Sequence, residues 1–123
     1  MSQVLIAIVD DEEPVRDATK TFVRSLGYNN VSTFGSADEF LKSEQVRDTS
    51  CVITDVQMPG LSGIDLQDHL AARGHCTPII FMTGYPDGNV RARAMKAGAV
   101  CFLNKPLSPD HFIGCIEKAL KAA

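Results

Sequence analysis

The chain has 123 residues, which is near the commonest size of a single domain and enough to bury a core without disulfides or metals. Its net charge of −3 argues against nucleic-acid binding by this segment, since such binding needs a basic patch. No apolar run approaches the roughly 20 residues of a membrane-spanning helix. The start of the chain carries no positive charge, so we expect no signal peptide and a cytoplasmic location.

The first half of the chain alternates apolar runs with helical patterns. Residues 3–9 form a continuous aliphatic run, which predicts a strand buried on both faces. Acidic residues and Pro14 then open a helix, which keeps apolar residues at helical spacing until Gly27 ends it. Residues 30–34 predict a short second strand. Ser36, with a glutamate three residues later, forms a capping-box pattern that opens a second helix.

The second half repeats this alternation three times. The predicted strands are residues 51–54, 78–82 and 99–103, and the predicted helices are residues 64–73, 90–97 and 109–122. Glycines stop the first two of these helices, and a serine followed by a proline opens the last one.

Five strand–helix units predict one α/β domain over residues 1–123, with a five-stranded parallel sheet and crossover helices on both faces, a (βα)5 arrangement. Such a domain binds its ligands outside the carboxyl ends of its strands. Polar side chains stand at four of these ends, and they are Asp10, Asp11, Asp55, Thr83 and Lys105. The fold and the residues therefore predict one shared site.

The three acidic residues of this site need a positive partner. Two unit charges ~4 Å apart repel by about 4 kcal/mol at an effective dielectric near 20. Lys105 supplies one positive charge, and a divalent cation bound by oxygen ligands supplies the rest. Mg²⁺ fits best, and Mn²⁺ is acceptable. We expect Asp11 to bind the metal directly and Asp10 to bind it through water, with Asp55 and the backbone carbonyl of Gln57 as further ligands.

Asp55 is the predicted nucleophile. It stands alone at the end of a buried strand with an exposed turn after it, and a carboxylate can accept a phosphoryl group. The charge that develops on the phosphoryl oxygens needs preorganised partners, which the metal, Lys105 and Thr83 supply. The arrangement favours aspartyl-phosphate chemistry.

Four segments carry a resemblance to a known family. They are Val9-Asp10-Asp11-Glu12, residues 54–63 (TDVQMPGLSG), Met82-Thr83-Gly84 and Asn104-Lys105-Pro106. Together and in this order they resemble the receiver domain of two-component response regulators over the whole chain. Residues 93–99 (RAMKAGA) are similar to the FixJ-like subgroup, whose members usually carry a DNA-binding domain after the receiver.

This resemblance implies a CheY-like, flavodoxin-like sheet with strand order 2-1-3-4-5. It also implies that Asp55 accepts a phosphoryl group from a sensor histidine kinase, that Thr83 turns toward it, and that Phe102 swings inward. The surface of the fourth helix, fifth strand and fifth helix then changes and recruits a partner, often a second copy of the chain. The Lys105–Pro106 peptide bond is expected to be cis.

The implied output is transcription regulation through a DNA-binding domain, and we expect no such effector domain within residues 1–123. A stand-alone receiver that acts by protein–protein contacts is the alternative. A phosphatase of the haloacid dehalogenase type needs an acid two residues past its nucleophile, where this chain has Gln57. No glycine-rich phosphate motif follows a strand, which argues against a nucleotide-binding module.

The four cysteines form no C-x-x-C pair, so no zinc or redox motif is expected. Cys51, Cys101 and Cys115 lie in apolar patterns and are expected to pack as small hydrophobes, whereas Cys76 is expected to be more exposed. Members of the family often have an acid where Cys101 stands. Phe102 lacks the hydroxyl group of the commoner tyrosine.

Overall fold

A five-stranded parallel sheet organises the described residues of the computed structural model, which are residues 4–85 and 87–122. The strands are β1 (Ile6–Val9), β2 (Val31–Phe34), β3 (Cys51–Asp55), β4 (Ile79–Thr83) and β5 (Cys101–Asn104). Their order is β2-β1-β3-β4-β5, which confirms the order that the family resemblance implied. The chain reverses its direction across the sheet after β2, so right-handed crossovers cover both faces with helices.

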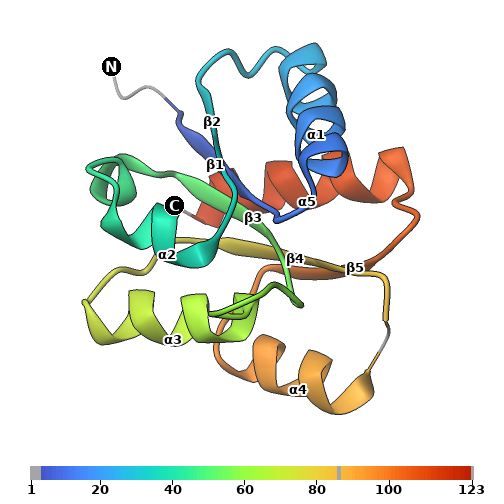
Figure 1. Cartoon of the computed structure of the whole chain (residues 1–123). Coiled ribbons are helices and arrows are strands. Elements are labelled where there is room, and N and C mark those ends of the chain that lie inside the picture. The colour runs from blue at the N-terminus through green and yellow to red at the C-terminus, as the bar shows by residue number, and fades with distance from the viewer. Residues whose placement is uncertain (1–3, 86, 123) are drawn as a thin grey trace.

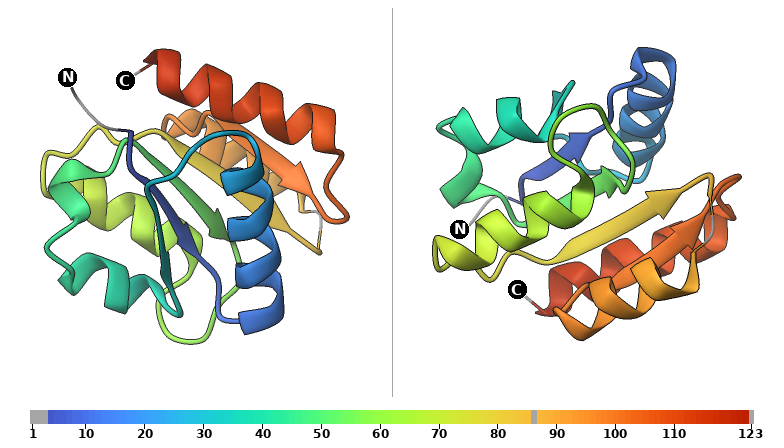
Figure 2. Two further views of the ribbon diagram at one scale, coloured as in Figure 1. Left: turned by 90° about the horizontal axis from the view of Figure 1, so that it is seen from above. Right: turned by 60° about the horizontal axis from the view of Figure 1, so that its bottom comes forward.

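An α-helix follows each strand, as predicted. The α-helices of the described residues are α1 (Glu13–Ser25), α2 (Ala37–Lys42), α3 (Gly63–Ala72), α4 (Gly88–Lys96) and α5 (Pro109–Ala122), and a short 3-10 helix, η1 (Val46–Asp48), follows α2. Helices α1 and α5 cover one face of the sheet, and α2, α3 and α4 cover the other (Figures 1 and 2). No described helix is both long and apolar enough to cross a membrane.

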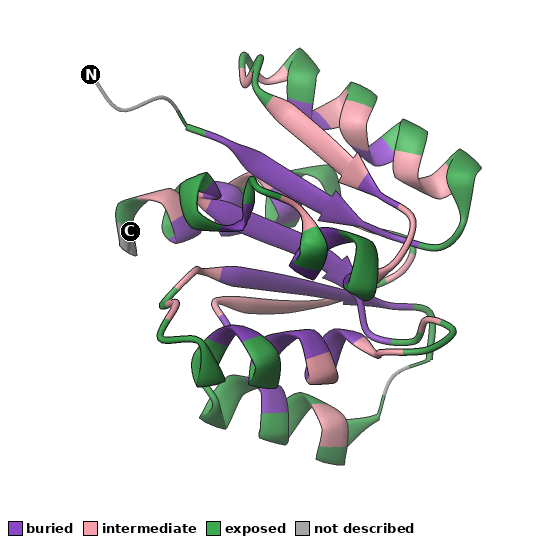
Figure 3. Cartoon of the chain, turned by 60° about the vertical axis from the view of Figure 1, so that its left-hand side comes forward, coloured by how far each residue is buried: buried purple, intermediate pink, exposed green. Residues whose placement is uncertain are grey.

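Each face of the sheet has its own core. On β1, Ile6 and Ile8 pack with α1 and α5, whereas Ala7 and Val9 pack with the helices of the opposite face. Strands β1, β3 and β4 are buried along their whole length (Figure 3). The helices are exposed on their outer surfaces, and α4 is exposed over most of its residues, with Ala94 buried. Burial on both faces explains why these strands are continuous apolar runs without polar alternation.

The observed bounds differ from the predicted ones by a few residues. The predicted start of the first strand at Gln3 lies outside the described residues, and β1 begins at Ile6. The fifth strand was predicted from residue 99, but the N–H of Ala99 donates to Ala94 O at 3.0 Å and so still belongs to the end of α4. The short helix η1 was not predicted, because three residues are too few to show a periodic pattern. Gly98 follows α4 with φ +104°, the left-handed conformation that the prediction required.

The helix caps differ from the prediction in one respect. Ser36 Oγ accepts the N–H of Glu39 at 3.0 Å, but the Glu39 carboxylate accepts the N–H of Gly35 at 3.1 Å, so only half of the predicted capping box forms. The complete capping box belongs to Ser62 and Asp65 at the start of α3. This cap fixes the end of the loop that follows Asp55.

Candidate functional site

The carboxyl ends of four strands meet at one edge of the sheet. The register pairs Asp55 with the penultimate residue of β4, and Thr83 with the last residue of β5. Asp10 follows β1 directly and Lys105 follows β5 directly. The parallel sheet therefore brings together side chains that are up to 95 positions apart, since Asp10 and Lys105 stand at the two extremes (105 minus 10).

Lys105 is the cationic centre of the site. Its Nζ donates to Asp55 Oδ2 at 2.6 Å and lies 3.7 Å from Asp10 Oδ2. Partial burial alone would lower the pKa of Lys105. The hydrogen bond to Asp55 and the negative charges of Asp55, Asp10 and Glu12 outweigh that effect, so the pKa is raised and the ammonium stays charged.

Asp10 is fully buried and only partly paired. Its Oδ1 accepts the N–H of Glu12 at 2.9 Å, while its Oδ2 is buried and has no hydrogen-bond partner. Burial raises the pKa of Asp10, and the Glu12 N–H and the charge of Lys105 act against that rise. A buried carboxylate oxygen without a donor is costly, so this atom is suited to a cation.

Three carboxylates can share such a cation. One oxygen each from Asp10, Glu12 and Asp55 lies within 4.8 Å of the others. Asp11, which was predicted as the direct ligand, is exposed and does not belong to this group. Glu12 was not predicted, although it directly follows the acidic pair. All three donors are carboxylate oxygens, which is the donor type that Mg²⁺ prefers.

The loop that follows β3 holds Asp55 in place. Its Oδ1 accepts the N–H of Gln57 at 3.1 Å, and Val56 O accepts the N–H of Gly63 at 2.9 Å. A Cβ at Gly63 would collide with the carbonyl oxygen of Asp55 and press on the ring of Phe81. The start of α3 therefore packs directly against the backbone of Asp55, and only glycine allows this approach. The sequence pattern gave no sign of this role for Gly63.

The hydroxyl of Thr83 is turned toward its own loop. Thr83 Oγ1 accepts the N–H of Tyr85 at 3.0 Å and lies 3.2 Å from Tyr85 O, to which it donates. Thr83 is buried, whereas Tyr85 is 71% exposed. The hydroxyl stands at the predicted strand end and is held by a turn rather than by Asp55.

Phe102 and the Lys105–Pro106 bond lie where the resemblance put them. Phe102 is half-buried on β5, and its ring centroid lies 6.0 Å from that of Phe81. The Lys105–Pro106 peptide bond is cis. Arg16, which no pattern singled out, donates from Nη1 to Asp10 O at 2.9 Å and so ties α1 to the end of β1.

Two cysteines depart from the prediction. Cys101 at the start of β5 and Cys115 in α5 form a disulfide, although both were expected to pack as free small hydrophobes. Their separation of 14 residues follows no short motif, so the pairing was invisible until β5 and α5 were placed together. Cys51 is buried and Cys76 is exposed, and both are free.

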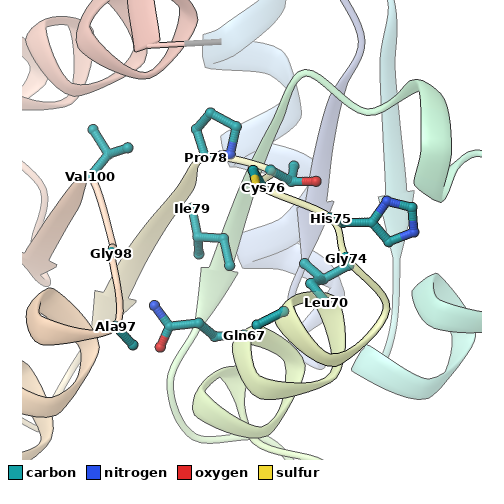
Figure 4. Close-up of a pocket in the computed structure, with 12 residues that line it drawn as sticks. Gln67, Leu70, Gly74, His75, Cys76, Pro78, Ile79, Ala97, Gly98 and Val100 are labelled. Carbon is teal, nitrogen blue, oxygen red and sulfur yellow. The ribbon is translucent and has the colours of Figure 1, made fainter.

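A cavity of about 380 Å³ lies at the opposite end of the sheet, between the carboxyl ends of α3 and α4. Figure 4 shows the amide of Gln67 turned toward Ala97 and Gly98. Gln67 Nε2 donates to Ala94 O at 3.1 Å, and its Oε1 is buried without a partner. The cavity shares no residue with the acidic site, and Gln67 ties α3 to α4 beside it.

Comparison with known proteins agrees with this geometry. A model of the response regulator receiver domain matches residues 6–117. The response regulator protein TmoT of Ectopseudomonas mendocina is 42% identical over 119 residues, which cover 97% of this chain and 54% of TmoT. The transcriptional regulatory protein FixJ of Bradyrhizobium diazoefficiens is 38% identical over 118 residues, which cover 96% of this chain and 57% of FixJ. The crystal structure of FixJ-N has a TM-score of 0.88 at 35% identity and covers 100% of this chain and 98% of that chain.

A parallel five-stranded sheet with acids, a hydroxyl and a lysine at its carboxyl edge defines a receiver domain. The chain belongs to the response regulator receiver domain family of two-component systems. It spans about half the length of the curated relatives it matches.

Proposed function

We propose that this domain is a phosphorylation-controlled switch, in which Asp55 accepts a phosphoryl group from a sensor histidine kinase in a Mg²⁺-dependent reaction. The observation that carries the proposal is the contact of Lys105 Nζ with Asp55 Oδ2 at 2.6 Å, beside the carboxylates of Asp10 and Glu12. A nucleophilic carboxylate held between a fixed cation and metal-binding oxygens suits phosphoryl transfer.

Asp10, Glu12 and Asp55 are the residues that would hold Mg²⁺. Their donors are all oxygens, and the buried Asp10 Oδ2 lacks a hydrogen-bond partner. The backbone carbonyl of Gln57 and the side chain of Asp11 stay predictions as further ligands. Bound Mg²⁺, or Mn²⁺ in its place, would neutralise charge on the phosphoryl oxygens.

The transfer itself is a substitution at phosphorus. A carboxylate oxygen of Asp55 attacks the phosphorus of a phosphohistidine, the new O–P bond forms as the P–N bond breaks, and the histidine nitrogen leaves with the electron pair. Lys105 Nζ donates a hydrogen bond to Asp55 Oδ2 and can move to a phosphoryl oxygen, because a lysine ammonium has three donors on a flexible side chain.

The same residues connect the chemistry to a change of surface. A phosphoryl group on Asp55 offers acceptors that compete with Tyr85 O for the Thr83 hydroxyl. Rotation of Thr83 toward Asp55 would leave space on the side of β4 that faces α4, and Phe102 on β5 would turn into it. The consequence is a new shape of the surface formed by α4, β5 and α5.

The proposed partners are a sensor histidine kinase and, after phosphorylation, a second copy of the chain. Because FixJ is named a transcriptional regulatory protein, we propose transcription regulation as the output, through a DNA-binding domain outside residues 1–123. The cytoplasmic location expected from the sequence stays a prediction.

Beryllofluoride tests the proposal without a kinase, since it mimics a phosphoryl group on a carboxylate. We expect a bound ¹⁹F NMR signal that requires Mg²⁺ and is absent from Asp55→Asn. Asp17→Asn, at an exposed position of α1, is the matched control and should keep the signal. A Mg²⁺-independent signal, or one that survives in Asp55→Asn, would refute the proposal.

A further inference from the structure

The disulfide between Cys101 and Cys115 joins the edge strand of the sheet to the last helix. Cys101 is the first residue of β5, Cys115 lies in the middle of α5, and their Cα atoms are 6.0 Å apart. Both belong to the core on the α1 and α5 side of the sheet. The two elements are those whose surface is proposed to change on phosphorylation.

One member of the pair can be reached by reagents, because Cys101 is partly exposed whereas Cys115 is buried. Cys101 and Cys115 line a groove of about 520 Å³ between α4, β5 and α5, and Cys101 is only half-buried. Cys51 gives the contrast within the chain, because it is fully buried and its burial raises the pKa of the thiol to about 12. A thiol with so high a pKa does not exchange, whereas partly exposed thiols do.

The charge of the groove indicates which oxidant it would admit. Arg91 and Lys118 line it together with His111, and among the described residues no acidic side chain does. Positive side chains that line a groove attract acidic ligands to it. The charge of the groove therefore favours a small acidic disulfide of the glutathione class as the oxidant.

We propose that Cys101 and Cys115 are a reversible thiol–disulfide modification site, oxidised by a small acidic disulfide, which locks β5 to α5 and lowers the response of the α4–β5–α5 surface. The effect on the response rests on the proposed function, whereas formation of the disulfide and its restraint of β5 against α5 do not. The resemblance offered no such site, since the family often has an acid at the position of Cys101.

The exchange proceeds in two balanced steps. The thiolate of Cys101 attacks one sulfur of oxidised glutathione, forming a mixed disulfide and expelling one glutathione thiolate. The thiol of Cys115 gives up its proton to solvent and attacks Sγ of Cys101, which expels the second glutathione. Two protein thiols are oxidised and one glutathione disulfide is reduced to two thiols.

The lock reaches the proposed switch residue through the geometry of a strand. Successive side chains of a strand point to opposite faces, so Cys101 faces α5 while the next residue, Phe102, faces the opposite core with Phe81. A covalent link from Cys101 to α5 fixes the backbone from which Phe102 must turn. The oxidised form should therefore resist the change of surface.

The test uses the full chain with Cys76→Ser, which removes the exposed free thiol, and a matched protein that also carries Cys101→Ser and Cys115→Ala. Both proteins are equilibrated in glutathione buffers of graded ratio, quenched, alkylated and mapped by peptide mass. We expect a Cys101–Cys115 disulfide whose fraction follows the buffer and returns to zero with dithiothreitol. Amide hydrogen exchange in β5 and α5 should be slower in the oxidised form only. If Cys101 and Cys115 are alkylated in all buffers, no disulfide forms and the proposal fails. Amide hydrogen exchange that does not respond to oxidation would show that the disulfide does not restrain β5 and α5.

The second arm measures dimerisation with Mg²⁺ and beryllofluoride. We expect the oxidised protein to dimerise at least about fivefold more weakly than the reduced protein, the lower end of usual allosteric couplings. The matched protein with Cys101→Ser and Cys115→Ala should give the same dimer dissociation constant in all buffers. Equal dimerisation of both forms, with beryllofluoride bound, contradicts the effect on the response. If beryllofluoride binds neither form, the proposed function fails, and hydrogen exchange still decides the lock.

Discussion

At the scale of single residues, Lys105 balances two carboxylates that differ in their surroundings. Asp10 is fully buried, and the Asp55 side chain keeps 9% of its surface exposed. A buried charge without a partner is expensive, so the ammonium of Lys105 helps the two acids to remain this close, and the proposed Mg²⁺ would add to that effect. This difference is consistent with the proposed roles, in which Asp55 is the nucleophile and Asp10 is a metal ligand.

Replacement of Lys105 by methionine should therefore separate metal binding from transfer. Lys105→Met removes a preorganised positive donor but leaves all three carboxylates, so we expect phosphoryl transfer from acetyl phosphate to slow by about 10²–10³-fold. Mg²⁺ affinity should not fall, because a competing cation has gone. Lys121→Met, at an exposed position of α5, is the matched control, and a wild-type transfer rate in Lys105→Met would contradict the assigned role.

Gly63 gives a second test, of the backbone behind Asp55. Gly63→Ala places a Cβ against the Asp55 carbonyl, and such overpacking should lower the free energy of unfolding by about 1–3 kcal/mol. Gly114 is the matched control, because it also lies in a helix and a Cβ there meets nothing within 4 Å. Gly114→Ala should raise stability by about 0.5–1 kcal/mol. Urea unfolding measures both changes, and equal shifts of the same sign would refute the close approach.

At the scale of elements, the capping box of α3 holds the loop that follows Asp55. Ser62 Oγ accepts the N–H of Asp65 at 3.1 Å, and the Asp65 carboxylate accepts the N–H of Ser62 at 2.9 Å. The hydrogen bond from the Ser62 N–H, followed by that with the Ser62 side chain, lowers the pKa of Asp65 below its usual 3.8. The stabilising form is therefore the ionised one.

The sign of this linkage gives a pH prediction. A carboxylate whose pKa is lowered on folding contributes stability above its unfolded pKa and loses that contribution as pH falls through the folded pKa. Asp65→Asn should thus lower the unfolding free energy at neutral pH by about 0.3–1 kcal/mol, the range for a charge in the first turn of a helix. The difference from wild type should close at pH values below the folded pKa. Urea unfolding across pH checks this, and a gap that widens in acid would contradict it.

Secondary structure was the part of the fold most accessible from sequence. Continuous apolar runs and glycine stops are local signals, so all five strand–helix units were predicted, with errors of a few residues at their ends. The strand order came from the family resemblance rather than from periodicity. Asp55, Thr83 and Lys105 were predicted to lie together because parallel strands place their carboxyl ends at one edge, and they do lie at that edge, whereas their roles stay predictions.

The contacts that sequence missed all join distant segments or depend on side-chain direction. Glu12, rather than the neighbouring Asp11, groups with Asp55, and the choice between adjacent acids depends on how the chain turns after β1. A glycine is needed at position 63 because the backbone of Asp55, 8 positions earlier in the sequence (63 minus 55), lies against it. Cys101 and Cys115 pair only because α5 returns along β5.

At the scale of the whole molecule, the α4–β5–α5 surface is the proposed output. Met95 is a large apolar side chain of α4 that stays 38% exposed, and it lines the groove beside the disulfide. Exposed apolar side chains in a groove favour contact with a partner. The proposed dimer should depend on this residue.

Met95→Glu should therefore weaken the beryllofluoride-activated dimer by at least about tenfold, because it puts a charge into an apolar contact. Binding of beryllofluoride at Asp55 should not change, since α4 does not contribute to the acidic site. Ala18→Glu, exposed on α1, is the matched control. Sedimentation velocity measures the dimer, and an unaltered dimer in Met95→Glu would place the contact elsewhere.

The central claim is that Asp55 is the phosphoryl acceptor of this receiver domain. It is tested most directly by intact-mass measurement after incubation with acetyl phosphate and Mg²⁺. We predict a mass increase of one phosphoryl group that requires Mg²⁺, is lost with hydroxylamine and does not occur in Asp55→Asn. Absence of the adduct from the wild-type protein, or an undiminished adduct in Asp55→Asn, would contradict the claim.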